Sequence, residues 1–431
     1  MALLLTCFVL FLVMGMPIAF VIGIAGFAYF LTVPYLTFET ATQMIVSQSQ
    51  SFAFLAVPFF IFAGNLMNVS GITNRLLGLA RLLTRGMYGG TAQISVVMST
   101  LMGGVSGSAT ADAAMETRIL GPEMLRIGYK KGYICAVNCV TALITATIPP
   151  SLGLIIFGFV GEVSIGRLFA AGLIPGVLMM AFLMTTTSIT SRLYKFDPPS
   201  RAHGAQKLSA AELGNNLKES VWALLFPVIL IVGIRFGIFT PSESGAFAVV
   251  YAIIIGKFVY KELNWKNFKE ALITTLKDNG AIMLIIAMSG PFSYAITWVK
   301  LPVALSNLIF GITDNPQLLV LIMLGFLFIT GMFVDSNVNF LLLTPIFLPM
   351  VKNAGIDPVH FGVLMATVVT LGVMTPPIGS ALYTVCGIID CPPEEYTKYS
   401  LPFMAAVLLE LAILVFLPGL VLWIPNMIFG H

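Results

Sequence analysis

Long apolar stretches separated by short polar segments run along the whole chain of 431 residues. A helix needs about 20 mostly apolar residues to cross a bilayer, and most of these stretches approach or exceed that length. Ten of them are predicted as membrane spans, at 2–14, 17–33, 51–70, 131–159 and 165–191 in the first half and at 220–236, 242–260, 279–299, 358–389 and 397–428 in the second. The pattern therefore predicts an all-α polytopic membrane protein.

Two further apolar segments, 90–124 and 316–350, each carry a polar break near the middle. The first break spans 103–112 and the second spans 331–339. Non-helical backbone has no water to bind in the bilayer core, so it is tolerated there only where it is buried in protein or lines a polar cavity. Each segment is therefore predicted as a re-entrant hairpin of two half-depth helices. An ordinary kinked span stays open as the alternative.

The polar breaks recur in the two halves of the chain, and each is followed by a Pro-Pro pair, Pro149–Pro150 or Pro376–Pro377. We expect a first repeat at 1–191, a cytoplasmic linker at 192–219 and a second repeat at 220–431. Each repeat holds five spans and one hairpin, and an odd number of spans turns the second repeat upside down. The sequence thus predicts an inverted-topology repeat, an arrangement that places a transporter's binding site at broken helices near the bilayer midplane.

Basic residues are concentrated on one side of the predicted spans, which receives 18 of the 22 Lys and Arg residues. Cytoplasmic loops carry such an excess, so this side is assigned to the cytoplasm and both termini to the periplasm. The first hairpin then opens from the cytoplasm and the second from outside. Two amphipathic segments, 37–51 and the stretch that begins at 260, are predicted as surface helices on opposite faces of the membrane.

The composition excludes a water-soluble protein, because 58% of the residues are hydrophobic and only 10% are charged. No phosphate-binding loop, nucleophile elbow or metalloprotease motif occurs, so neither an enzyme nor a nucleic-acid-binding protein is expected. The five cysteines show no CxxC or Cys/His spacing and are predicted to be small residues in helix packing, without a disulfide framework or zinc. The start of the chain lacks the basic segment of a secretory signal and is expected to be a retained membrane segment.

Broken helices can bind both ions and substrate. A half-helix that begins at mid-membrane offers free N–H groups, which suit a substrate carboxylate, and one that ends there offers carbonyls, which suit a cation. The Pro-Pro pairs free carbonyls around 145–148 and 372–375, because proline supplies no N–H. A single pair would indicate a simple kink, whereas two pairs at equivalent positions favour ion sites. Sodium is a hard cation and takes oxygen ligands of this kind.

Three carboxylates lie in apolar sequence, where each needs a partner. Asp335, beside Asn337, is the functional candidate. Asp112 is expected to cap the hairpin or to pair with Arg118. Glu410 is expected to make a contact between helices.

Several segments together resemble the large membrane subunit of tripartite ATP-independent periplasmic (TRAP) transporters, over essentially the whole chain. They are Gly15-Met16-Pro17-Ile18-Ala19-Phe20, the run from Val57 to Gly64, the run from Gly104 to Asp112, and Thr375-Pro376-Pro377-Ile378-Gly379. The resemblance implies an elevator fold, in which a transport domain carrying both hairpins slides against a scaffold of the other spans. It also implies sodium-coupled import of organic acid anions across the bacterial inner membrane.

The resemblance implies partners as well: a periplasmic substrate-binding protein and a small four-helix membrane subunit, which this chain is expected to have as a separate protein. It further assigns site residues, to within a residue or two. The first sodium site is expected at Gly104, Ser106, Thr145, Ile148 and Pro150, and the second at Gly331, Gly372, Thr375 and Ile378. Substrate is expected between the hairpin tips, at Ser106, Ser108, Ser151, Asp335 and Asn337. Sialic acids and C4-dicarboxylates are both open as substrates.

A stand-alone sodium-coupled dicarboxylate carrier shares the inverted-hairpin plan and is the alternative. Such carriers have Ser-Asn-Thr at both tips, whereas this chain has Ser106-Gly107-Ser108 at one tip and Asp335-Ser336-Asn337 at the other. The tips therefore favour the TRAP subunit.

Overall fold

The computed structural model describes residues 2–33, 36–50, 52–198, 210–311, 313 and 315–430, and every regular element within them is a helix. In the first half the helices are α1 (Ala2–Val13), α2 (Ile18–Thr32), α3 (Phe38–Ser49), η1 (Phe52–Leu55), α4 (Ala56–Val69), α5 (Ile72–Leu83), α6 (Gly90–Gly103), α7 (Ala109–Ile127), α8 (Lys131–Thr141), α9 (Leu143–Thr147), α10 (Leu152–Gly161) and α11 (Ile165–Leu193). In the second half they are α12 (Ala210–Arg235), α13 (Pro241–Ile254), η2 (Ile255–Val259), α14 (Trp265–Trp298), α15 (Leu301–Phe310), α16 (Pro316–Phe333), α17 (Ser336–Asn353), α18 (Pro358–Val373), α19 (Ser380–Ile389), α20 (Pro393–Phe416) and α21 (Pro418–Phe429). Residues 199–209 of the predicted linker lie outside the described part of the chain.

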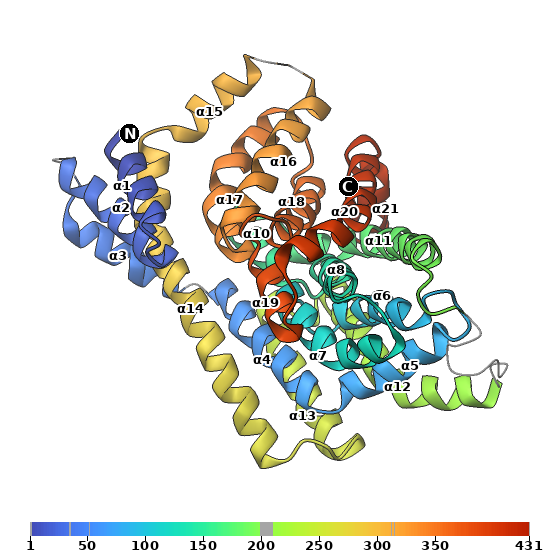
Figure 1. Ribbon diagram of the computed structural model, residues 1–431. Helices are drawn as coiled ribbons and strands as arrows, with labels where there is room; N and C mark the ends of the chain where they lie inside the picture. The colour runs from blue at the N-terminus through green and yellow to red at the C-terminus, as the bar shows by residue number, and fades with distance from the viewer. Residues whose placement is uncertain are drawn as a thin grey trace.

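Both segments predicted as hairpins are pairs of helices joined by a short break. α6 and α7 are joined through 104–108, and α16 and α17 through 334–335. The helices of each pair pack against each other, and Figure 1 shows α16 and α17 side by side. The helix pairs are therefore confirmed, whereas their half-depth position in a bilayer and the inverted repeat stay predictions.

Within the described residues, six helices are long and apolar enough to cross a membrane, and eight spans result if each of two bent pairs counts as one. The bent pairs are α4 with α5, at 66°, and α8–α9 with α10, at 42°. Shorter apolar helices accompany them, among them α1, α2 and α18. The chain is thus a multi-pass membrane protein with fewer uninterrupted spans than apolar length alone predicted, because breaks divide several of the stretches.

The second amphipathic segment does not form a separate surface helix, contrary to the prediction. α14 runs from Trp265 to Trp298 as one helix of 34 residues, which is about 51 Å at 1.5 Å per residue. It joins that segment to the span predicted at 279–299. The only proline in α14 is Pro291, near its end, so nothing interrupts the backbone hydrogen bonds at the polar turn between the two parts. The first amphipathic segment does form its own helix, α3, which packs against α14.

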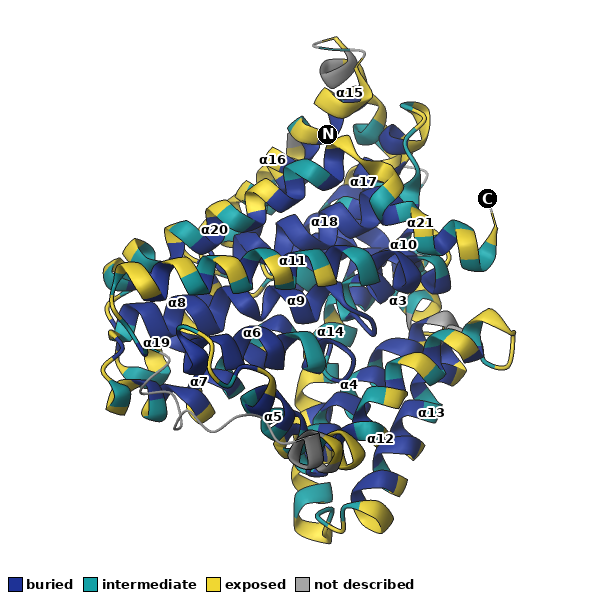
Figure 2. Ribbon diagram, turned by 90° about the vertical axis from the view of Figure 1, so that its right-hand side faces the viewer, coloured by how far each residue is buried: buried dark blue, intermediate teal, exposed yellow. Residues whose placement is uncertain are grey.

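The helices pack in two neighbouring groups that share one hydrophobic core. In one group, α14 packs against α2, α3 and α4, and α4 packs against α13. In the other, α8, α9 and α18 lie at the centre, where Figure 2 shows mostly buried residues. Every residue of α18 from Val359 to Val373 is buried, as expected of a helix that is apolar on all sides. The two halves of the chain interleave in this group, because α7 packs against α19 and α10 against α17.

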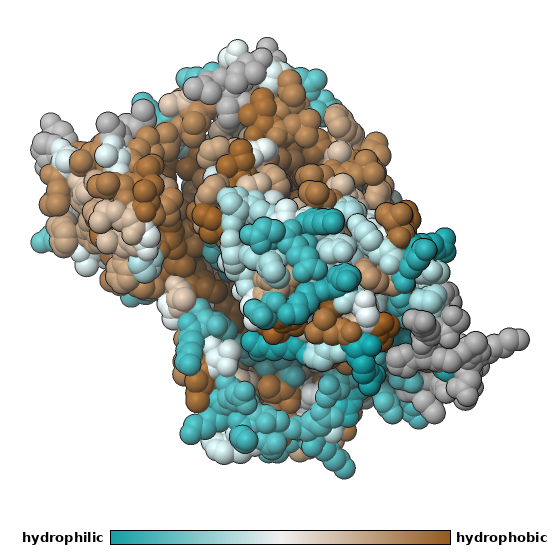
Figure 3. All heavy atoms as spheres, viewed as in Figure 1, coloured by the Kyte–Doolittle hydropathy of each residue, from teal (hydrophilic) through white to brown (hydrophobic). Residues whose placement is uncertain are grey.

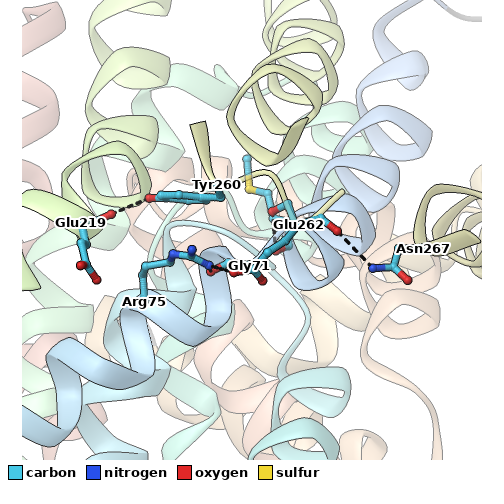
Figure 4. A network of polar contacts seen from close by, with 8 residues as sticks. Gly71, Arg75, Glu219, Tyr260, Glu262 and Asn267 are labelled. Carbon is cyan, nitrogen blue, oxygen red and sulfur yellow. Dashed lines mark hydrogen bonds and ion pairs between the residues drawn. The ribbon is translucent and has the colours of Figure 1, made fainter. Parts of the chain in front are cut away.

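A polar network attaches the loop before α14 to α5 and α12 (Figure 4). Arg75 of α5 forms an ion pair with Glu262, and its guanidinium carbon lies 4.3 Å from the centroid of the Tyr260 ring. The Tyr260 hydroxyl donates to the Glu219 carbonyl at 2.7 Å, and burial raises the pKa of Tyr260, so this donor keeps its proton. The Asn267 amide donates to the Glu262 carbonyl at 3.3 Å. The network fixes where α14 begins.

The surface divides into an apolar and a polar part. In Figure 3, apolar side chains dominate the upper part of the molecule, whereas polar side chains gather over the lower part, where α5, α12 and the beginning of α14 lie. A protein embedded in lipid has such a surface, which is apolar where it contacts lipid and polar where it contacts water.

Candidate functional site

The first break, between α6 and α7, is built from glycine. Gly107 has a left-handed φ of +68°, and a Cβ atom there would lie 2.4 Å from the Pro150 carbonyl oxygen. Only glycine allows both this conformation and this approach. A Cβ atom on Gly103 would lie 2.7 Å from Ile148 Cβ, and the Leu152 N–H donates to the Gly107 carbonyl at 3.4 Å. The first tip is thus packed directly onto the proline turn between α9 and α10.

That proline turn is buried and held by its own hydroxyls. The Ser151 hydroxyl donates to the Ala146 carbonyl at 2.5 Å and accepts from the Leu154 N–H at 3.4 Å, so it caps α10. The Thr145 hydroxyl donates to the Ser99 carbonyl at 3.0 Å. The turn therefore forms a rigid base behind the first tip.

The second break, between α16 and α17, is capped by a carboxylate. Asp335 Oδ1 accepts from the Asn337 N–H at 2.9 Å, which places a negative charge at the positive end of α17. The Asn339 side chain donates to the Val334 carbonyl at 2.9 Å. Asp335 is exposed, and it lines a cavity between the helices.

The second proline turn, between α18 and α19, meets α16 backbone to backbone. A Cβ atom on Gly331 would lie 2.6 Å from the Val369 carbonyl oxygen, and one on Gly372 would lie 2.7 Å from the Gly331 Cα. The Thr375 N–H donates to the Gly372 carbonyl at 2.9 Å. Two glycines therefore allow α16 and α18 to touch at the level of the break.

Both tips face one cavity of about 520 Å³, a suitable volume for a small organic ligand. The residues of the tips in its wall are Ser106, Ser108, Asp335 and Asn337. Asn65 of α4 and Asp278 of α14 also line it, with the Asn65 amide donating to Asp278 Oδ2 at 3.3 Å. A smaller cavity of about 100 Å³ lies between the tips and shares Ser108, Asp335 and Asn337 with the larger one.

The structure brings together four of the five residues predicted to contact substrate, since Ser106, Ser108, Asp335 and Asn337 share the large cavity. Ser151 lies behind the first tip instead. It has no exposed surface, and its hydroxyl is engaged in capping α10. A serine that follows a Pro-Pro pair could contact the substrate or cap the next helix. The sequence does not distinguish these two roles, whereas the fold does.

Around the first predicted sodium site, Ser106 and Thr145 lie beside the carboxylate of Asp112. This carboxylate is fully buried, and within the described residues neither of its oxygens receives a hydrogen bond of normal geometry, although the hydroxyls of Ser106 and Thr145 are close enough to stabilise its charge. Arg118, the partner considered from the sequence, is exposed. An unpaired buried carboxylate is costly, so Asp112 is suited to a bound cation and is a site candidate that the sequence analysis missed. The signal was an aspartate in the first turn after Ser-Gly-Ser.

The remaining residues assigned to the first sodium site lie in the first tip or in the proline turn beside it. Ile148 and Pro150 belong to the proline turn against which the tip is packed. Gly104 faces the other way, because a Cβ atom there would lie 2.4 Å from Pro227 Cγ of α12. This face of Gly104 thus packs on α12. Gly104 could bind an ion only through its backbone carbonyl.

The second predicted sodium site is also partly assembled. Gly331, Gly372 and Thr375 lie together where α16 meets the proline turn. Ile378 belongs to the same turn, with a side chain that is 53% exposed. Glu410 of α20 lies outside both sites. It is buried, and within the described residues its carboxylate oxygens have no hydrogen-bond partner, so any contact that it makes between helices is not a hydrogen bond.

The two tips differ in what their helix ends offer. α7 begins after Ser108 without any side-chain cap, so its first N–H groups are available to a ligand. α17 begins with Asp335 already bound to its N-terminus. Among the residues that the structure describes, no Lys or Arg lines the large cavity. An anion in this cavity would therefore meet the start of α7 as its main positive partner.

Comparisons with known proteins give consistent results. The sequence profile of the family described as "Tripartite ATP-independent periplasmic transporter, DctM component" matches residues 5–420. The 2,3-diketo-L-gulonate TRAP transporter large permease protein YiaN of Escherichia coli (strain K12) is 33% identical over 408 residues, which cover 95% of each chain. The sialic acid TRAP transporter large permease protein SiaM of Vibrio cholerae is 33% identical over 419 residues, covering 97% of this chain and 96% of the relative. The solved structure of the Alcanivorax borkumensis YdaH transporter is similar in fold, with a TM-score of 0.64 over 89% of this chain and 90% of that one, at 14% identity.

Proposed function

The chain belongs to the large permease subunits of TRAP transporters, and from this membership we propose that it imports organic acid anions into the bacterial cell, driven by sodium. Proteins of this family are transporter subunits rather than enzymes, and they work with a periplasmic binding protein and a small membrane subunit. We infer that this chain uses partners of both kinds in the inner membrane. The observation that carries the proposal is that both hairpin tips line the same large cavity.

The substrate carboxylate is placed at the uncapped start of α7, and the rest of the substrate extends toward Asp335 and Asn337. The α7 N–H groups favour an anion through hydrogen bonds and through the helix dipole. Asp335 is an acceptor and Asn337 both a donor and an acceptor, so this end of the cavity suits substrate hydroxyl groups. A hydroxylated carboxylic acid therefore fits better than a purely apolar one.

The names of the relatives fit such a substrate class. YiaN is named for 2,3-diketo-L-gulonate and SiaM for sialic acid, both of which are carboxylic acids that carry several hydroxyl groups. We propose sialic acids and related sugar acids first for this chain. C4-dicarboxylates are the second class. Their carboxylate could bind at the N-terminus of α7, but they have no hydroxyl group to donate to Asp335.

Sodium is proposed to bind behind each tip. At the first site the carboxylate of Asp112, with Ser106 and Thr145 beside it, supplies hard oxygen ligands and needs a cation to offset its burial. At the second site the backbone around Gly331, Gly372 and Thr375 supplies carbonyls. Ions at these places would hold each tip against its proline turn. Sodium would then favour substrate binding, because the ions hold both tips in the positions that form the substrate site.

We further propose that the two helix groups are the scaffold and the moving part of an elevator. The group that contains both hairpins also contains both proline turns, so ions and substrate would travel with it. During transport the moving group would slide along the surface of the scaffold group. The inverted repeat and the periplasmic position of both termini belong to this proposal.

Transport in proteoliposomes tests the proposal. The chain is reconstituted with its small membrane subunit, the binding protein loaded with radiolabelled sialic acid is added outside, and an inward sodium gradient is imposed. Uptake should require sodium, the binding protein and the small subunit together. Equal uptake from a proton gradient in sodium-free buffer would contradict the coupling. Full uptake by this chain alone would support a stand-alone carrier instead.

A further inference from the structure

Three cysteines that lie far apart in the sequence meet in the fold. Cys135 lies on α8, Cys386 in the last turn of α19, and Cys391 directly after α19. Their sulfur atoms all lie within 4.8 Å of one another, and all three residues are buried. None of them forms a disulfide. Their spacing along the chain matches no metal-binding motif, and for this reason the sequence did not reveal the group.

The local structure keeps the three thiols together. α8 and α19 pack against each other, and the Cys135 thiol donates to the Val385 carbonyl at 3.6 Å. After α19 the chain turns back through Asp390, whose φ of +51° is left-handed, and the Cys391 N–H donates to the Cys386 carbonyl at 2.9 Å. This turn returns Cys391 to the end of α19, beside Cys386.

The distances suit a shared soft acceptor atom. Three sulfurs bound to one central atom at about 2.3 Å are about 4.0 Å apart in a plane and about 3.5 Å apart in a pyramid. Sulfurs that all lie within 4.8 Å of one another can reach either arrangement if each moves by about 1 Å or less. Soft thiolate sulfurs select soft acceptors, and no histidine or carboxylate belongs to the group.

Charge decides which soft acceptor fits. Three thiolates carry three negative charges, and a net charge left in a buried site is costly. The charged neighbours do not offset it, because Glu394 and Glu395 add two negative charges near Cys386, whereas Lys131, which donates to the Asp390 carbonyl at 2.9 Å, adds one positive charge. A monovalent or divalent ion would leave the group negative, whereas a trivalent one makes it neutral.

We propose that Cys135, Cys386 and Cys391 form a binding site for trivalent arsenic. Arsenous acid reacts with three thiols to give one As(S)3 centre and three water molecules. Each thiol proton leaves with a hydroxide of the acid, three As–O bonds are replaced by three As–S bonds, and no atom is oxidised or reduced. The product is uncharged. Asp390 is exposed and adjoins Cys391, which gives the small neutral acid a way in.

The bound atom would join α8 to the end of α19. α19 contributes Thr384 to the wall of the large cavity, so the adduct would fix an element of the proposed transport site. This consequence rests on the proposed function, whereas the binding itself does not.

The test measures arsenic bound to the purified full-length protein, reduced with a phosphine. After incubation with arsenite and removal of the free reagent, elemental mass spectrometry should find one arsenic atom per chain, removable by a small dithiol. Cys135→Ala, Cys386→Ala and Cys391→Ala should each lower the bound arsenic at least tenfold. Cys7→Ala, in α1, and Cys139→Ala, one turn from Cys135, should retain it. Undiminished binding by Cys135→Ala, or loss of binding in Cys139→Ala, would overturn the assignment.

A second measurement on the unaltered protein does not depend on the variants folding. X-ray absorption at the arsenic edge should show three sulfur neighbours and no oxygen. An arsenic atom with oxygen neighbours, or with two sulfurs only, would also overturn the proposal. Neither readout requires transport, so a failure of the proposed function would leave this test intact.

Discussion

The two hairpin tips occupy similar places around one cavity but are built by different chemistry. The first tip depends on Gly107 in a left-handed conformation, leaves α7 uncapped and has the unpaired carboxylate of Asp112 behind it. The second has no glycine at its tip, and Asp335 caps α17 from the cavity side. One tip thus offers free N–H groups and the other offers a carboxylate. A pair of helix breaks therefore need not be chemically equivalent, and the proposed substrate would meet different chemistry at its two ends.

The bases of the tips differ as well. The first tip meets a proline turn that is buried from Thr145 to Ser151. The second meets a turn whose residues Pro377 and Ile378 are exposed, and there the close contact is between the backbones of Gly331 and Gly372. We therefore expect the first tip to be sensitive to changes in its own conformation and the second to changes of charge.

Gly107→Ala should have the largest effect on transport. The left-handed conformation costs a residue with a side chain about 1–2 kcal/mol, and the new Cβ atom would lie 2.4 Å from the Pro150 carbonyl oxygen. The tip would then have to leave the proline turn, and sodium-driven uptake should fall to background. Gly128→Ala is the matched control, because Gly128 is also left-handed but has nothing within 4 Å of the added atom. Equal uptake by the two variants would show that the first tip is not tightly seated.

Asp112→Asn should separate sodium binding from folding. It replaces a buried, unpaired charge with a neutral group, so the protein without sodium should be as stable as the wild type or more stable. Sodium should raise the Tm of the wild type through binding to the folded state and should raise that of the variant much less. Transport should fall about 100-fold, as expected for about 2.7 kcal/mol of lost ion binding. Thermal unfolding with and without sodium measures this.

The control for that experiment is Asp278→Asn, which removes an exposed carboxylate from the wall of the large cavity. It should keep the sodium-dependent rise in Tm. If Asp112→Asn kept the same rise as well, the first sodium site would have to be placed elsewhere.

Asp335→Asn should impair transport at the second tip while the fold survives. Asparagine is as good a helix cap as aspartate, so the start of α17 should be retained. A hydrogen bond to a charged acceptor contributes about 1.5–3 kcal/mol, so its loss should reduce uptake of a hydroxylated acid about 10- to 100-fold. Glu410→Gln removes a buried carboxylate remote from the cavity and should change uptake little. Near-normal uptake by the Asp335→Asn variant at matched abundance would show that Asp335 only caps α17 and does not bind substrate.

The sequence could predict the breaks but not every residue that serves them. Glycine and hydroxyl residues inside apolar runs located both tips, because such residues are tolerated in a bilayer core only for a structural reason. The continuity of α14 was not predictable, since the polar turn at 277–280 looks like a helix end although it contains no proline. Asp112 was also missed, because whether a carboxylate has a partner depends on the packing of α6, α7 and α9. The group formed by Cys135, Cys386 and Cys391 arises only when α8 meets α19.

Ser108→Ala and Ser151→Ala should show the smallest effects and should differ in kind. Ser108 lines both cavities at the first tip, so its loss should raise the KM for substrate several-fold and leave Tm nearly unchanged. Ser151 caps α10 from a buried position, so its loss should lower stability by about 1 kcal/mol and leave KM unchanged. Uptake kinetics and thermal unfolding of both variants measure the contrast. If Ser151→Ala raised KM as much as Ser108→Ala does, Ser151 would reach the substrate in another state of the transport cycle, and the first proline turn would be part of the binding site rather than its base.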